Sequence, residues 1–209
     1  EILTYIRHSE KVFIMRRLLL ILILTLCFQT LTKADEINEF EIEGISIGDS
    51  LLNHVTLSEI KIFEQNPTYY KNNKFVTIFV DINLEQYERL QVVYKPDDKR
   101  FILHEIKGLI DYEKNIDECK ELKETVSVSL INLFNNPEII SEIKPHAADK
   151  SNMSTSDSTV LYPKDGGFVH IACTNYSIEM NEKHGWRDNF QVTIGSDEFR
   201  LWLANEEYK

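Results

Sequence analysis

An amphipathic helix with a cysteine on its apolar side constrains this chain more than any other feature of its sequence. The helix is predicted to begin at Asn115, a residue typical of helix N-caps, and to end before Asn136-Pro137. Between these limits, apolar residues recur at spacings of three and four at Ile116, Cys119, Leu122, Val126, Leu130 and Leu133. A helix with such a stripe packs against another element, so Cys119 is expected to face the core.

A second cysteine lies on a predicted strand. The segment Phe168–Ile178 has the composition of a long strand, and side chains alternate between the two faces of a strand. Cys173 therefore shares one face with Val169 and Ile171, and His170 lies on the other. If the Cys173 face packs on the stripe of the helix, the two sulfur atoms can meet.

The segment Met15–Ala34 is predicted to be a cleavable signal peptide. Arg16 and Arg17 precede an apolar run that ends at Phe28, and Thr32-Lys33-Ala34 supplies the small residues of a cleavage site. The run is shorter than the roughly 20 residues of a membrane-spanning helix. We therefore favour cleavage over an uncleaved anchor. Residues 1–14 are then expected to lie upstream of the true start, and the exported chain to have no membrane span.

Cys119 and Cys173 are the two cysteines that remain after removal of the signal peptide. Exported proteins reach oxidising compartments, where disulfides persist. An even pair in an exported chain indicates a Cys119–Cys173 disulfide, with two free buried thiols as the alternative. Closing a loop of about 55 residues contributes roughly 4 kcal/mol in the chain-entropy account.

The rest of the pattern favours strands joined by short turns. Leu90–Tyr94 and Phe101–Ile110 flank Lys95–Lys99, where proline followed by aspartate predicts a hairpin turn. Further strands are predicted at Phe40–Ile47, with a bulge or turn at Gly44, at Phe75–Ile82 and at Phe190–Ile194, and a last helix is predicted from Ser196. Residues 35–209 are therefore expected to form one α+β domain, a mostly antiparallel sheet with the amphipathic helix packed on one face.

The charge of the chain disfavours two classes of partner. The chain has 23 Lys and Arg against 34 Asp and Glu, a net charge of −11. Such a surface repels phosphate backbones and anionic lipid, so nucleic acid and membrane surfaces are not expected partners.

One short motif suggests an enzyme. Gly48-Asp49-Ser50-Leu51 resembles the nucleophile block of the GDSL esterases and lipases, and the resemblance would make Ser50 a nucleophile. A serine needs a neighbouring base to be reactive at neutral pH. The family's Asp-x-x-His and its Gly-x-Asn-Asp block are both missing here. We therefore prefer a glycine turn in which Asp49 or Ser50 caps a short helix.

The histidines and loop acids show no metal-binding pattern. No two histidines stand four residues apart, and none joins a cysteine or carboxylate at the spacing of a zinc site. His104 and His170 lie on predicted strands, where a structural histidine is the preferred interpretation. Trp186 and the pair Tyr69-Tyr70 are aromatic candidates for partner or sugar contacts, although such residues more often cover the end of a core. We expect neither a metal nor a cofactor.

Four segments together are similar to a family of small exported proteins of unknown function from AT-rich marine bacteria. They are Phe40–Leu52, the helix Ile116–Phe134 with its cysteine, Asp149-Lys150-Ser151 and the Cys173 strand. The resemblance spans most of residues 35–205 and includes both cysteines. It implies a Gram-negative, periplasmic setting and carries no information about an activity.

The sequence therefore predicts an exported, periplasmic or secreted, non-catalytic protein that binds a partner protein or a small solute. The polar segment Pro145–Thr159 is expected to be a mobile loop and a contact surface. Two alternatives stay open: a serine hydrolase that uses Ser50, and a purely structural envelope protein.

Overall fold

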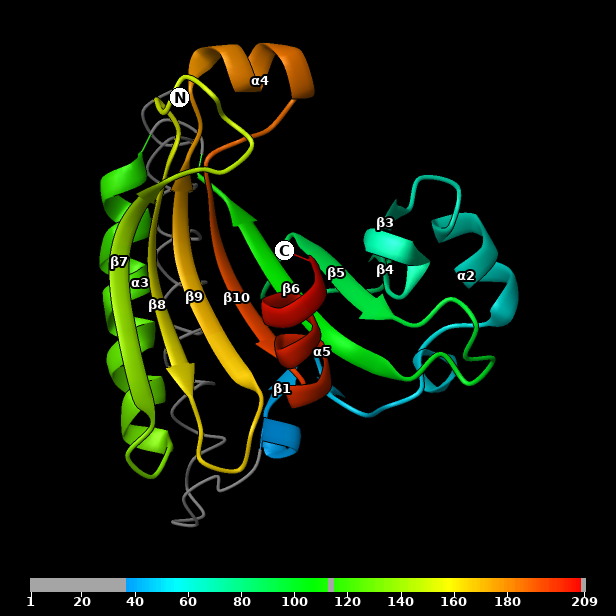
Figure 1. Ribbon diagram of the computed structural model, residues 1–209. Helices are drawn as coiled ribbons and strands as arrows, with labels where there is room; N and C mark the ends of the chain where they lie inside the picture. Colours follow the sequence, from blue (N-terminus) through cyan, green and yellow to red (C-terminus); the bar gives the residue numbers. More distant parts are fainter. Residues whose placement is uncertain (1–36, 113–114, 208–209) are drawn as a thin grey trace, which may run out of the picture. The chain divides into compact units, whose positions relative to one another are not determined.

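A computed structural model describes residues 37–112 and 115–207, which form one α+β domain (Figure 1). A mostly antiparallel sheet dominates it, as the sequence predicts. The segment assigned to the signal peptide and the residues before it lie outside the described residues. Export and cleavage therefore stay predictions.

The large sheet has eight strands in the order β3-β4-β5-β6-β10-β9-β8-β7, and every neighbouring pair is antiparallel. The strands are β3 Thr68–Tyr69, β4 Val76–Val80, β5 Arg89–Tyr94, β6 Leu103–Asp111, β7 Glu138–Pro145, β8 Thr155–Tyr162, β9 Phe168–Asn175 and β10 Asn189–Gly195. The predicted hairpin is confirmed as β5 and β6. A separate two-stranded hairpin comprises β1 Glu41–Ile42 and β2 Ile45–Ser46.

Helix starts follow the capping residues in the sequence. The helices are α2 Leu57–Phe63, α3 Ile116–Leu133, α4 Ile178–His184 and α5 Asp197–Trp202. Thr56 and Glu59 form a reciprocal capping box at α2. Asn115 accepts a hydrogen bond from the backbone N–H of Glu118 at α3, and Ser196 accepts one from Phe199 at α5. Each cap satisfies a backbone donor that the first turn leaves without a partner.

Alternation along the strands gives the sheet two different faces. One face presents apolar side chains such as Ile171, Val192 and Ile194, which belong to the main core together with Cys119 and Leu130 of α3. We call this the α3 face. The other, which we call the open face, carries mainly polar side chains over its central strands.

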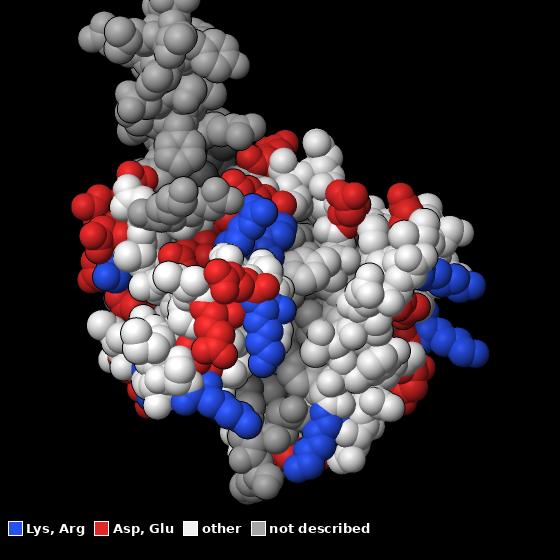
Figure 2. Space-filling view, turned by 90° about the horizontal axis from the view of Figure 1, so that it is seen from above, with Lys and Arg blue, Asp and Glu red and all other residues white. Residues whose placement is uncertain are grey.

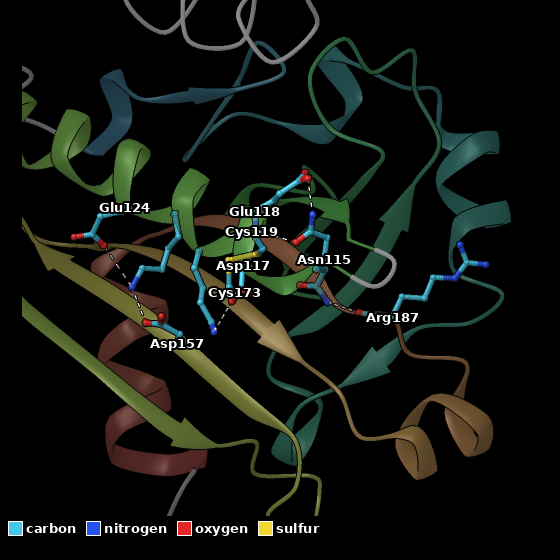
Figure 3. The surroundings of a disulfide bond; sticks show 11 residues. Asn115, Asp117, Glu118, Cys119, Glu124, Asp157, Cys173 and Arg187 are labelled. Carbon is cyan, nitrogen blue, oxygen red and sulfur yellow. Dashed lines mark hydrogen bonds and ion pairs between the residues drawn. A yellow bond between two sulfur atoms is a disulfide. The ribbon is translucent and has the colours of Figure 1, made fainter. Parts of the chain in front are cut away.

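The predicted disulfide is present and joins α3 to the sheet. Cys119 and Cys173 are bonded, with their Cα atoms 5.9 Å apart, so the two elements pack as the sequence predicts. Beside the bond, the buried ammonium of Lys123 lies 2.6 Å from the carboxylate of Asp157 on β8 (Figure 3). The helix is thus held to two neighbouring strands by a covalent bond and an ion pair.

The prediction of a mobile loop over the whole of Pro145–Thr159 is wrong, because the loop is shorter. Its residues from Thr155 onward belong to β8, which pairs with β7 over the whole length of both strands. The remaining turn is organised by Asp149, which is only 5% exposed and accepts hydrogen bonds from Ser151, Ser154 and Ser177. The hydrogen bonds from Ser151 and Ser154 hold the pKa of Asp149 well below its usual range. A polar composition therefore concealed an ordered turn.

The predicted strand Phe168–Ile178 is also shorter than expected. It ends at Asn175 because Ser177 caps α4 by accepting a hydrogen bond from the backbone of Met180. Helix α4 in turn ends at Gly185, whose φ of 66° lies in the left-handed region that glycine adopts without strain.

Candidate solute-binding cleft

A cleft of about 870 Å³ lies on the open face of the sheet. Its floor is formed mainly by β5, β6, β9 and β10. Two aromatic clusters close its ends. At one end, Phe168 lines the cleft, and behind it lies a buried cluster of Phe75, Phe199 and Trp202. At the other, the ring of Trp186 lies 5.2 Å from that of Tyr176 and 5.6 Å from that of His146.

The floor of the cleft is a row of polar side chains in cross-strand register. Thr193 of β10 pairs with Lys107 of β6 on one side and with His170 of β9 on the other. Earlier on β10, Gln191 and Asn189 lie on the same face as Thr193 and also line the cleft. The Cα atoms of directly opposed residues on neighbouring strands are about 4.5–5.5 Å apart. The side chains of Thr193, Lys107 and His170 can therefore contact the same bound molecule.

Most of the buried polar atoms without a partner gather in this cleft. Within residues 37–112 and 115–206, five buried side-chain polar atoms have no hydrogen-bond partner. Four belong to residues that line the cleft: Arg89 Nε, His146 Nδ1, Asn189 Oδ1 and Thr193 Oγ1. A buried polar atom without a partner costs about 1–3 kcal/mol, so their convergence on one place indicates a ligand site.

The charged groups of the cleft are paired with one another. The guanidinium of Arg89 forms an ion pair with Asp111, and that of Arg187 lies 3.8 Å from the same carboxylate. The ammonium of Lys107 lies 3.8 Å from the carboxylate of Glu105. Each cation that lines the cleft thus faces an acid, which disfavours a strongly charged ligand.

Burial shifts the protonation of the groups around the floor. It lowers the pKa of His170 to about 4, with a smaller contribution from the charge of Lys107. It also lowers the pKa of His146 and raises that of Glu105, against the opposing effect of Lys107. His170 is therefore neutral at pH 7, with one ring nitrogen that donates and one that accepts.

Ser50 lies outside this cleft and is engaged as a helix cap. Its hydroxyl donates a hydrogen bond of 2.5 Å to the backbone carbonyl of Arg100 and accepts one from the backbone N–H of Leu52. Close by in the sequence, Asp49 and His54 pair with each other, with Oδ2 and Nε2 atoms 3.5 Å apart. The geometry matches the preferred capping interpretation, and both hydrogen bonds described for the Ser50 hydroxyl are to backbone groups. The hydrolase hypothesis thus gains no support from it.

The other candidates from the sequence are distributed unevenly. His146, His170 and His184 line the cleft together with Trp186 and Tyr70. His104 is a structural histidine as predicted, since its Nδ1 lies 3.2 Å from the hydroxyl of Ser196. In the part of the chain that the structure describes, no group of three or more His, Cys, Asp or Glu could hold a metal ion.

Sequence reasoning missed the cleft residues Arg89, Asn189 and Thr193. The available signal was the polar alternation along β5 and β10, but a solvated sheet face shows the same alternation.

Comparisons with known proteins do not narrow the function. No family model, no curated protein and no solved structure matches this chain. Among the described residues, no helix is long and apolar enough to cross a membrane. Seen from above, basic side chains lie among acidic ones and do not gather into a basic patch (Figure 2). The function is therefore inferred from the cleft.

Proposed function

We propose that this chain is an exported, non-catalytic protein that binds a small, uncharged, polar solute in the cleft on the open face. The observation that carries the proposal is the convergence of four buried, unpartnered polar atoms on one cleft of about 870 Å³. Ligand pockets commonly combine such a volume with a few convergent polar groups.

The chemistry of the lining selects the class of solute. Arg89, Lys107 and Arg187 are already paired with acids, so a ligand charge finds no uncompensated partner. The remaining floor offers amides, hydroxyls and neutral imidazoles, which both donate and accept hydrogen bonds. Hydroxyl-rich molecules match this lining, and the rings of Phe168, Tyr176 and Trp186, which line the cleft, offer apolar surface to their C–H groups.

The first experiment is mass spectrometry of the protein recovered from the periplasm after expression of the full chain in a Gram-negative bacterium. A mass that begins at Asp35 and is about 2 Da below that of the reduced form supports export, cleavage and the disulfide. A full-length or lipid-shifted mass contradicts export as a cleaved, unanchored protein. An additional native mass that disappears on denaturation identifies a bound solute.

A matched pair of variants tests the cleft itself. Thr193→Val removes an unpartnered buried hydroxyl from the cleft, and Ser127→Ala removes one from α3, outside the cleft. With the co-purified solute, or with neutral monosaccharides and polyols as probes, Thr193→Val is expected to weaken binding about tenfold or more. Ser127→Ala should leave affinity unchanged.

Equal affinity for both variants contradicts the site. Labelling of the protein by a fluorophosphonate that disappears in Ser50→Ala would replace the proposal with a serine hydrolase.

A further inference from the structure

The two edges of the large sheet differ in what they expose. One edge is β3, which has only two residues. The other is β7, whose eight residues pair with β8 on one side and with no strand of residues 37–112 and 115–207 on the other. Three isoleucines of β7 are exposed, Ile139 at 44%, Ile140 at 41% and Ile143 at 69%. A long apolar edge with free backbone groups is a template for pairing with another strand.

The sequence of β7 is complementary to itself. When two copies run antiparallel with Ser141 opposite Ser141, Glu138 of each copy lies opposite Lys144 of the other. Ile139 then lies opposite Ile143 on the α3 side of the sheet, twice. Opposite charges and apolar pairs at directly opposed positions each stabilise a ladder by about 0.2–1 kcal/mol.

Neighbouring registers bring like charges together. A shift that places Ile140 opposite its own copy puts Glu138 opposite Glu142. The opposite shift puts Glu142 directly against its own copy. A shift by a single residue places the α3 side of one strand against the open side of the other, which a two-fold axis perpendicular to the sheet forbids. Of these registers, the Ser141-centred one alone keeps the faces matched without opposing like charges, and it places Ile140 opposite Glu142.

We propose that two copies of this chain associate through β7, antiparallel and centred on Ser141, to form one continuous sheet. The contact is isologous, so every pair of side chains occurs twice. Lys144 is 2.6 Å from Glu142 of its own strand, and the partner's glutamate adds a second acid to the same ammonium. Both clefts then open on the same side of the extended sheet. This proposal does not depend on solute binding.

Cysteine crosslinking tests the register. Ser141→Cys places two cysteines directly opposite each other, where Cα atoms are about 4.5–5.5 Å apart, within the range that a disulfide spans. The matched control is Glu142→Cys, whose copies lie diagonally across the ladder at about 7–8 Å, too far for a disulfide. Under mild oxidation, Ser141→Cys is expected to give a covalent dimer and Glu142→Cys a monomer. The reverse result, or equal crosslinking of both, overturns the proposal.

Charge reversal tests the contact without new cysteines. Sedimentation equilibrium of the full chain is expected to show a dimer that Glu138→Lys weakens about tenfold or more, because two ion pairs become like-charge pairs. The double variant Glu138→Lys/Lys144→Glu restores both pairs and should restore the dimer. Circular dichroism confirms that each variant is folded. A wild-type monomer at all concentrations, or a double variant as weak as the single one, overturns the proposal.

Discussion

On β10, Val192 and Ile194 point toward α3, whereas Gln191 and Thr193 point into the cleft on the opposite face. The α3 face is mainly apolar, closely packed and crosslinked through Cys119 and Cys173. The open face holds buried polar atoms that have no partner in the described residues. Residues 191–194 of β10 thus stabilise the core through one face and carry an unpartnered hydroxyl, that of Thr193, on the other.

The contrast suggests a division of labour between the two faces. Burial of apolar surface stabilises the fold, while an unpartnered buried polar atom destabilises it. A protein keeps such atoms where binding a ligand satisfies them, as functional sites commonly do at the expense of stability. Substitutions of buried apolar residues on the α3 face should therefore lower stability, and substitutions that remove unpartnered polar atoms from the cleft should raise it while weakening binding.

The largest expected effect is loss of the disulfide on the α3 face. The double variant Cys119→Ala/Cys173→Ala is expected to lose about 4 kcal/mol of unfolding free energy, because the unfolded chain regains the freedom of a long loop. Urea unfolding at neutral pH measures the loss. Reductant should destabilise the wild type by a similar amount and leave the double variant unchanged. A loss below about 1 kcal/mol would mean that apolar packing alone holds α3 in place.

A cavity on the α3 face gives the next largest effect. Ile194 is fully buried in the main core, so Ile194→Ala is expected to lose about 2–5 kcal/mol through lost burial and the cavity left behind. Urea unfolding gives this value, and solute affinity should not change, since the side chain points away from the cleft. A weakened affinity in a folded Ile194→Ala protein would show that the two faces are coupled.

The α3 face could be predicted from the sequence because its signals are local. The apolar stripe that contains Cys119 repeats within one helix, and the face shared by Val169, Ile171 and Cys173 repeats within one strand. Those two patterns were sufficient to place the helix on the sheet. The capping role of Ser50 was equally accessible, because an N-cap depends on residues that are close in sequence.

The cleft and β7 could not be predicted, for two physical reasons. Arg89, Lys107, His170 and Thr193 come from four strands, and only the strand order brings them into one place. Each strand alone looks like an ordinary solvated face. Strand β7 is exposed on both sides, so its isoleucines show no clean alternation. The turn that follows it, which Asp149 organises, was hidden by its polar composition.

Acid provides a test of the open face. Burial lowers the pKa of His170 to about 4 from an ordinary value near 6.5, so the folded state favours the neutral ring. Its stabilising contribution is fully present above pH 6.5 and is lost as the pH falls toward 4. Because the ring is partly exposed to the cleft, we expect this one group to cost between about 1 and 2 kcal/mol on going from pH 8 to pH 5.

Comparison of variants isolates this contribution from that of other titrating groups. His170→Gln should flatten the stability profile between pH 6.5 and pH 5 relative to the wild type, as measured by urea unfolding at each pH. The same substitution at the exposed residue His184 serves as the control. A wild-type profile in His170→Gln would mean that the floor of the cleft is open to water.

The smallest expected effect has the opposite sign and tests the comparison most directly. Thr193 is 1% exposed and its hydroxyl has no partner in the described residues, so the nearly isosteric Thr193→Val is expected to raise the unfolding free energy by about 1 kcal/mol. Ser127→Ala should act in the same direction, because it removes another unpartnered hydroxyl. Differential scanning calorimetry of the ligand-free proteins gives both values.

Only Thr193→Val should also weaken solute binding. A gain in unfolding free energy combined with a loss of solute affinity distinguishes a binding face from a poorly packed core. A Thr193→Val protein that is destabilised as much as Ile194→Ala would show that the hydroxyl has a structural partner. The two faces of β10 would then serve the same purpose, and the case for a ligand would have to rest on Arg89, His146 and Asn189 alone.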